Sequence, residues 1–289
     1  WYLLPPGAGD LPVAPGGGPI PAPSDGPVIR ADPAGSAGPA GPAGLLPLVV
    51  RFVGYGGGRG IPVEHALLPA AGFATFVMDV RGQGGRWAVG ATGDSAAGPG
   101  AGPELSTVMT RGLARPEDYY YSRLFTDAVR AVETAAGLPG IDPARVAVSG
   151  ASQGGALALA SAALLPGTVA VCHADVPFLC DIERAVTLAP KAPYTEVAEF
   201  LSNHTGLVDV AFATLRYVDC ALLARRITAE CLLSVGLMDD ICPPSTVFAA
   251  YNAIRSGKDI AVHPFSAHVV PTAHIERQLT HLRQHLQPG

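Results

Sequence analysis

A serine at a predicted strand-to-helix junction is the first candidate for chemistry. The apolar run "RVAVSG" at 145–150 leads into "GASQGG", and Ser152 is the serine at the centre of that turn. An Ala- and Leu-rich segment typical of a helix begins at Gln153. A turn this tight needs small residues two positions before and after the serine, and it exposes the hydroxyl at the helix N-terminus. The pattern predicts a nucleophilic serine; the alternative is a simple glycine-rich turn.

A nucleophilic serine needs a base, and the base needs an acid that fixes its tautomer. In folds with this turn the chain order is serine, acid, histidine. The predicted strand at 230–236 ends just before Asp239 and Asp240, so the candidate acid is one of these two. The histidine is expected in the loop between the final strand and the last helix, a position that only His268 occupies.

The remaining C-terminal histidines are interpreted as structural. His263 lies within the predicted final strand. The last helix is predicted over 271–286, with a buried stripe formed by Ile275, Leu279, Leu282 and Leu286. We interpret the histidines that flank this stripe as helix-surface residues: His274, His281 and His285.

A tetrahedral intermediate needs hydrogen-bond donors for its oxyanion. The backbone N–H of Gln153, directly after the serine, is one candidate. The second is expected after an early strand, where "RFVGYGGGRG" allows a close approach of backbone to ligand, and Tyr55 is the candidate there. The alternative is that these glycines form only a flexible connection.

Two further polar residues lie near the same edge of the sheet. Arg81 and Gln83, in "MDVRGQGGRW", follow another predicted strand. A serine nucleophile is typical of enzymes that hydrolyse esters, and an uncharged ester needs no guanidinium. We therefore interpret Arg81 as a brace between loops rather than a substrate contact.

The elements that would position these residues alternate along the chain. Predicted strands are short, nearly continuous apolar runs, as in a parallel sheet covered on both faces: 48–53, 73–79, 145–150, 169–175, 230–236 and 259–264. Helical segments are predicted over 119–136, 153–165, 194–203, 244–255 and 271–286. This alternation predicts an α/β fold with a doubly wound, mostly parallel sheet flanked by helices.

Composition narrows the class of protein. The chain has 289 residues, of which 48% are hydrophobic, and a net charge of −5 without a basic run. These values predict a well-buried core and disfavour binding to nucleic acid or an anionic membrane. No apolar stretch is long enough to span a bilayer, and no signal peptide is visible. The five scattered cysteines indicate neither a disulfide framework nor a zinc site, so a cytoplasmic location is expected, with no metal or other cofactor.

The N-terminal part differs from the rest. Glycine and proline supply more than half of residues 5–44, with no apolar periodicity. We therefore expect residues 1–44 to be a partial N-terminal strand and a poorly ordered loop, and residues 45–289 to form the catalytic domain.

The motifs taken together resemble one family. The segments "GYGGGRG", "MDVRGQG", "DYYYSRLFTDAVRAVE", "GASQGG", "PYTEV" and "GLMDDICPPSTVFAAYN" occur in the order and spacing of the acetyl xylan esterase and cephalosporin C deacetylase family, carbohydrate esterase family seven. The resemblance covers about residues 45–286. It implies an α/β-hydrolase fold and a metal-free serine mechanism. The implied substrates are acetylated xylo-oligosaccharides, other small acetylated sugars and cephalosporin C.

The resemblance also assigns residues. It places the triad on Ser152, Asp239 and His268, which selects Asp239 over Asp240, and the oxyanion hole on the N–H groups of Tyr55 and Gln153. Pro193 and Tyr194 match a stretch that shapes a small acyl pocket. Family members often form hexamers, so a homo-oligomer is expected.

Two departures from the family suggest an alternative. Val269 replaces the glutamate that follows the histidine in the family, and the N-terminal region is shorter. The alternative to an esterase is therefore a catalytically impaired homologue that binds a sugar or a protein partner.

Overall fold

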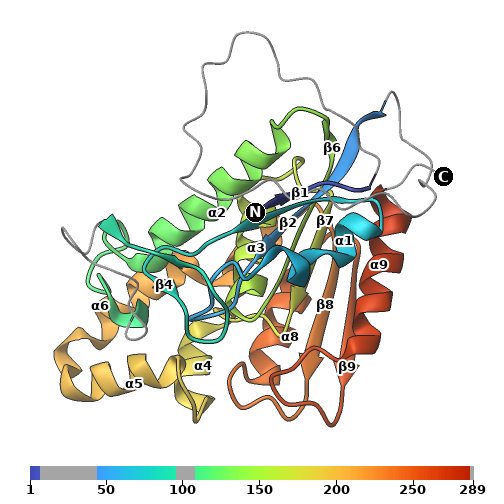
Figure 1. The fold of residues 1–289 in the computed structure, drawn as a ribbon. Helices are drawn as coiled ribbons and strands as arrows, with labels where there is room; N and C mark the ends of the chain where they lie inside the picture. The colour runs from blue at the N-terminus through green and yellow to red at the C-terminus, as the bar shows by residue number, and fades with distance from the viewer. Residues whose placement is uncertain (7–43, 96–107, 287–289) are drawn as a thin grey trace.

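A central sheet organises the protein. The computed structural model describes residues 1–6, 44–95 and 108–286, and within these ranges the sheet has seven strands in the order β1-β3-β2-β6-β7-β8-β9 (Figure 1). Only β1 is antiparallel to its neighbour. The strands are β1 (Tyr2–Leu3), β2 (Leu46–Phe52), β3 (Ala74–Met78), β6 (Ile141–Ala151), β7 (Val171–Asp175), β8 (Glu230–Gly236) and β9 (Lys258–His263). The predicted mostly parallel sheet is confirmed, with all six predicted strands present. A separate hairpin pairs β4 (Gln83–Gly84) with β5 (Ala91–Thr92).

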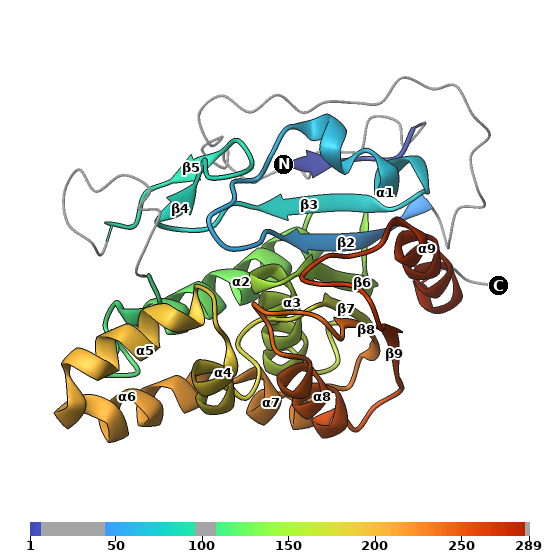
Figure 2. The same ribbon diagram turned by 90° about the horizontal axis from the view of Figure 1, so that it is seen from below.

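Helices cover both faces of the sheet. Figure 2 shows one face covered by α2 (Tyr120–Ala136), α3 (Gln153–Leu164), α7 (Cys220–Leu223) and α8 (Pro244–Ala253). The opposite face carries α1 (Leu67–Ala70) and α9 (Thr272–Leu286). The described 3-10 turns span Pro62–His65, Val108–Thr110, Thr205–Leu207, Arg216–Val218 and Ala224–Arg226.

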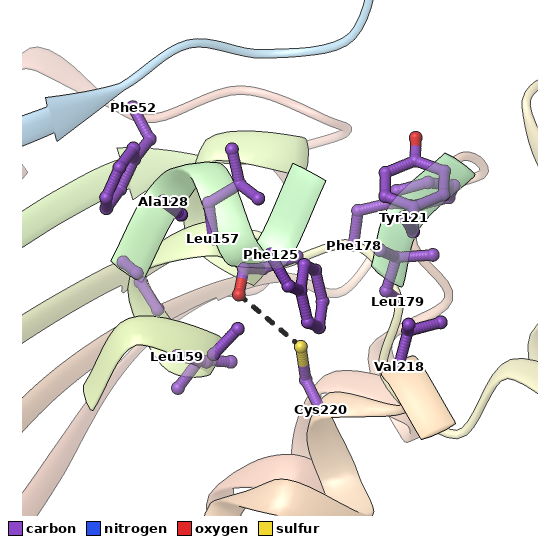
Figure 3. Packing of buried hydrophobic residues seen from close by; sticks show 14 of the residues in the cluster. Phe52, Tyr121, Phe125, Ala128, Leu157, Leu159, Phe178, Leu179, Val218 and Cys220 are labelled. Carbon is purple, nitrogen blue, oxygen red and sulfur yellow. Dashed lines mark hydrogen bonds between the residues drawn. The ribbon is translucent and has the colours of Figure 1, made fainter. Parts of the chain in front are cut away.

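The main core lies on the α3 side. Leu157 and Leu159 of α3 pack with Phe125 of α2 and with Phe178, and the Cys220 thiol of α7 donates to the Ala156 carbonyl at 3.5 Å (Figure 3). Residues 153–163 of α3 are all buried. A helix enclosed by the sheet and by other helices needs no polar stripe, which explains why this segment is apolar on all sides.

The α9 side is thinner and more polar, and it corrects two sequence-based expectations. Leu282 and Leu286 are buried, whereas Ile275 and Leu279 remain partly exposed, so the predicted stripe is incomplete. His274 is buried at 3% exposure, and its interpretation as a helix-surface residue was wrong. The reason is that the first turns of α9 cover polar side chains at the carboxyl ends of the strands, where His274 Nε2 lies 2.9 Å from Asp175 Oδ1.

Three short helices between β7 and β8 were not predicted. They are α4 (Ile182–Leu188), α6 (Val208–Leu215) and α7, whereas α5 (Tyr194–Asn203) has the predicted bounds. Figure 1 shows α4, α5 and α6 extending away from the sheet below its carboxyl edge. This excursion carries the Pro193 segment to the same edge as Ser152.

The remaining expectations concern the N-terminal part and membranes. The Gly/Pro-rich loop falls almost entirely on residues 7–43, outside the described residues. Among the residues that are described, no helix has both the length and the apolar character needed to cross a bilayer.

Candidate active site

Steric constraints hold Ser152 in its turn. The residue lies between β6 and α3 with φ 58°, a backbone conformation that costs a non-glycine residue about 1–3 kcal/mol. A Cβ atom on Gly150 would lie 2.4 Å from the carbonyl carbon of Gly154. A Cβ on Gly154 would lie 2.4 Å from the Phe52 carbonyl oxygen. Only glycine fits at both positions, which is the steric demand of the "GASQG" pattern.

His268 is oriented by a carboxylate. Its Nδ1 lies 2.7 Å from Asp239 Oδ2. The other carboxylate oxygen, Oδ1, accepts the backbone N–H groups of Ile241 at 2.9 Å and Cys242 at 2.8 Å. These bonds fix the buried Asp239, which in turn holds the Nδ1 proton of His268 and leaves Nε2 as the proton acceptor.

The neighbouring carboxylate has a different environment. Asp240 lies 2.6 Å from Lys191 Nζ at the surface, and a hydrogen bond to that ammonium lowers the pKa of the Asp240 carboxyl. Of the two acids that follow β8, Asp239 alone contacts the histidine in the described structure.

Ser152 and His268 line one cavity of about 820 Å³. No hydrogen bond joins the two side chains in the described structure; in ligand-free enzymes this contact is often long and tightens only with substrate. Cys242 lies beside the serine: burial raises the pKa of its thiol, an effect that a hydrogen bond with Ser152 partly offsets. The thiol is therefore protonated near neutral pH.

The two candidate oxyanion donors lie where the sequence places them. Gln153 occupies the first turn of α3, where backbone N–H groups have no partner within the helix. Tyr55 lies in the loop after β2 and lines the cavity. Neither N–H donates to an acceptor within the described part of the chain; Tyr55 borders the cavity, whereas Gln153 is buried directly behind Ser152.

A buried amide connects the two segments that carry the candidate oxyanion donors. Gln83 accepts the Gly56 N–H at 2.7 Å and donates to the Gln153 side chain at 2.8 Å. It also donates to the Tyr120 hydroxyl at 2.8 Å, and the Tyr121 hydroxyl donates to Gln153 at 2.9 Å. Gln83 does not line the cavity; it fixes the loop after β2 relative to the start of α3.

Trp87, which the sequence analysis did not single out, covers the same loop. Its indole N–H donates to the Tyr55 carbonyl at 2.8 Å. A Cβ on Gly57 would lie 2.2 Å from the indole ring. The tyrosine side chain is anchored separately, because its hydroxyl donates to Glu196 at 2.8 Å; burial and this carboxylate raise the pKa of Tyr55.

The two residues expected in the acyl pocket are placed differently. Pro193 lines the cavity beside Ala192. Tyr194 is fully buried and does not line it; its hydroxyl accepts the Leu179 N–H at 2.9 Å, and its ring packs on Phe178 with centroids 4.4 Å apart. Tyr194 can shape an acyl pocket only through the backbone that it supports.

Arg81 lies away from the cavity. Its guanidinium pairs with Asp127 of α2 and lies 3.4 Å from Asp94. Arg123 of α2 also contacts Asp94, at 2.6 Å. These pairs tie the loop after β3 to α2, which is the geometry expected of a brace.

Several cavity-lining residues were not found from the sequence. They are Arg51, His65, Trp87, Val176 and Ile241. Two of them carried a local signal: Val176 directly follows β7, and Ile241 follows the two candidate acids Asp239 and Asp240. No group of three or more histidine, cysteine, aspartate or glutamate side chains that could hold a metal ion occurs among the described residues.

Comparison with known proteins identifies the family. The sequence model of the acetyl xylan esterases (AXE1) matches residues 34–286. The chain belongs to the acetyl xylan esterase (AXE1) family. This match confirms the family and the esterase class that the motifs predict.

Relatives agree with this assignment. The chain is 31% identical over 171 residues to the acetyl esterase Axe7A of Xylanibacter ruminicola, and the match covers 55% of this chain but only 35% of that relative. The solved acetyl xylan esterase from Paenibacillus sp. R4 shares 34% identity with a TM-score of 0.77, over 88% of this chain and 78% of that one. Acetyl xylan esterase 1 from Thermoanaerobacterium sp. JW/SL YS485 shares 35% identity with a TM-score of 0.75, over 84% and 76%. These structures confirm the α/β-hydrolase fold.

Proposed function

We propose that the protein is a serine esterase that removes acetyl groups from small acetylated carbohydrates such as xylo-oligosaccharides. The observation that carries this proposal is the arrangement of Ser152 and His268 on one cavity, with His268 Nδ1 2.7 Å from Asp239. Family membership supports the acetyl ester as the reacting group.

In the first half of the reaction the Ser152 oxygen attacks the acetyl carbonyl carbon. His268 Nε2 accepts the hydroxyl proton, and the charge that develops on the imidazolium is stabilised by Asp239. The carbonyl electrons move onto the oxygen, which the N–H groups of Tyr55 and Gln153 stabilise. The oxyanion then collapses, the bond between the acyl carbon and the sugar oxygen breaks, and the imidazolium gives its proton to that oxygen, which leaves as a sugar hydroxyl.

The second half releases acetate. Water attacks the acetyl-serine carbonyl while His268 accepts its proton, and the same N–H groups stabilise the second oxyanion. Collapse of this intermediate breaks the bond to Ser152 and restores its hydroxyl. The segment at Ala192 and Pro193 lines the cavity beside the serine, and a small acyl group such as acetyl suits such a site.

Two other functions remain as alternatives. The same site could take the acetyl ester of cephalosporin C, because the reacting group is unchanged. A binding module without turnover is favoured by Val269 beside His268 and by the absence, within the described structure, of a Ser152–His268 hydrogen bond. The bond between His268 and Asp239 argues for the esterase, since a binding module has no need of an oriented imidazole.

The first test is pre-steady-state hydrolysis of 4-nitrophenyl acetate. We expect a burst of nitrophenol equal to the enzyme concentration, followed by slower turnover, because the acetyl-enzyme forms before water attacks. Ser152→Ala should lose the burst and lower kcat by about 10⁶-fold. Acetate release from acetylated xylo-oligosaccharides and from cephalosporin C then ranks the substrates. Absence of both burst and turnover in the folded protein would favour the binding module.

A further inference from the structure

A second charged group lines the catalytic cavity. Arg51, in β2, is partly buried and borders the same cavity as Ser152 and His268. Its side chain emerges on the α9 side of the sheet, because Val49, two residues earlier, packs there with Leu282 and Leu286. A strand buried on both faces ordinarily carries apolar residues at such a position, so the arginine needs an explanation.

The Arg51 guanidinium has no hydrogen bond or ion pair within the described chain. Burial lowers the pKa of Arg51, and the negative charge of Asp175 opposes this shift. The Asp175 carboxylate already has other partners. It accepts hydrogen bonds from Ser234 Oγ and Gln278 Nε2, both at 2.7 Å, and His274 Nε2 lies 2.9 Å away. Arginine stays protonated in proteins, so a partly desolvated charge faces the cavity.

The other charged groups around the cavity are either compensated or solvated. Arg59 pairs with Asp79 at 2.7 Å. Arg86 and Glu64 are exposed, and Glu64 accepts the Ile61 N–H at 3.0 Å. Because water screens exposed charges, a bound anion gains most at Arg51.

The register of the sheet relates the backbone positions of Arg51 and Ser152. Arg51 pairs with Ser149, three residues before Ser152 on β6. At about 3.3 Å per residue the two backbone positions are offset by about 10 Å along the strands. Because an acetyl group is uncharged, a ligand whose acetyl group lies at Ser152 can present an anion to Arg51 only through its alcohol part.

We propose that Arg51 binds a carboxylate on the alcohol part of the substrate, so that the site prefers acetyl esters of sugar acids over those of neutral sugars. This inference rests on the proposed esterase function and names its substrate class. A guanidinium can bind a carboxylate through two parallel hydrogen bonds, which adds orientation to attraction. The contact is remote from the reacting carbonyl, so it lowers KM more than it changes kcat.

The test compares two acetylated probes: methyl glucuronoside with a free carboxylate, and the same glucuronoside with that carboxyl group converted to a methyl ester. Both probes carry acetyl groups on the same hydroxyls, and they differ in charge. We expect the protein to release acetate from the acid with a kcat/KM at least about tenfold higher, mainly through KM. Arg51→Gln should abolish this preference by lowering kcat/KM for the acid to the value for the methyl ester, mainly through a higher KM for the acid. Arg51→Lys, which keeps the charge but not the planar fork, should retain part of the preference.

Arg86→Gln is the matched control, because it removes an exposed arginine from the same cavity. The preference should survive in this variant. Equal rates on the two probes, a preference that survives Arg51→Gln, or one that disappears in Arg86→Gln would overturn the proposal.

A binding measurement separates this inference from the proposed function. Calorimetry with methyl glucuronoside and the Ser152→Ala protein needs no turnover, and we expect binding that Arg51→Gln weakens by about tenfold. Binding without hydrolysis by the unsubstituted protein would retain the carboxylate site and reject the esterase. Absence of binding, with the neutral ester still hydrolysed, would reject the carboxylate site alone.

Discussion

The two helical layers of the protein hold Ser152 and His268 by different means. On the α3 side, Ser152 is fixed by close packing: α3 is buried from Gln153 to Ala163, and Gly150 and Gly154 leave no space for a Cβ. On the α9 side, His268 lies in a loop followed by the exposed Val269, and its placement depends on the bond to Asp239.

The layers beneath these residues differ in the same way. The α3 side is an extended apolar core. Under α9 lie polar side chains in contact with one another, including Asp175 with Ser234 and Gln278, and His173 with His281 at 3.2 Å. Ser152 is thus positioned by excluded volume and His268 by hydrogen bonds. Substitutions on the two sides should therefore have different effects: those on the α3 side should lower stability, and those at the bond between His268 and Asp239 should lower activity.

Among the substitutions that test this contrast, the largest effect is expected on the hydrogen-bonded side. Asp239→Asn should lower kcat by about 10⁴-fold, because an amide cannot hold the required imidazole tautomer and charge. Steady-state hydrolysis of 4-nitrophenyl acetate measures the loss. Asp240→Asn, which removes a surface carboxylate one residue away, should change kcat by less than about twofold, since an exposed ion pair contributes little. Equal losses in the two variants would mean that Asp239 is not the acid of the site.

The second prediction tests excluded volume on the α3 side. Gly154→Ala places a methyl group 2.4 Å from the Phe52 carbonyl oxygen and should lower the free energy of unfolding by about 1–3 kcal/mol. Urea unfolding followed by circular dichroism measures this change. Gly206→Ala is the control, because no atom lies within 4 Å of the added carbon. If Gly154→Ala is as stable as Gly206→Ala, steric exclusion does not hold the serine turn.

The smallest expected effect concerns the polar layer and pH. Burial lowers the pKa of His173 to about 3; Asp175 opposes this shift, and His281, His274 and His285 add to it. Between about pH 3 and 6.5 the unfolded chain binds a proton at this position that the folded protein does not bind. Stability should therefore fall as the pH falls through this window, by up to about 1.4 kcal/mol per pH unit from His173.

His173→Gln keeps a polar side chain but removes this titration. The free energy of unfolding is measured at pH 5 and pH 6. It should depend on pH less steeply in this variant than in the unsubstituted protein, by about 1 kcal/mol per pH unit. His204→Gln at the exposed end of α5 is the control and should leave the slope unchanged. An unaltered slope in His173→Gln would show that the polar layer does not govern the acid sensitivity of the fold.

The same contrast explains what could be predicted from the sequence. The strands and the serine turn were predictable because each depends on a local pattern: continuous apolar runs for β2 and β7, and small residues around Ser152. The placement of Asp239 and His268 after β8 and β9 was predictable because parallel strands bring their carboxyl ends to one edge.

The features that were missed depend on contacts distant in sequence. The burial of His274 follows from Asp175, almost 100 residues earlier in the chain. Arg51 looks like an irregularity in an apolar strand until the sheet places it on the cavity of Ser152. Tyr194 follows a cavity-lining proline, but its side chain turns into the core toward Leu179. Periodicity and local motifs do not indicate contacts between residues that are distant in sequence.

The central claim is that an activated serine hydroxyl at position 152 reacts with a carbonyl or an equivalent electrophile. Treatment with a fluorophosphonate, followed by digestion and mass spectrometry, tests it most directly. We expect one phosphonyl group per chain, located on Ser152, and labelling at least about 100-fold slower in His268→Ala, because the hydroxyl then lacks its base. A folded protein that takes no label, or takes it at another residue, would contradict the account.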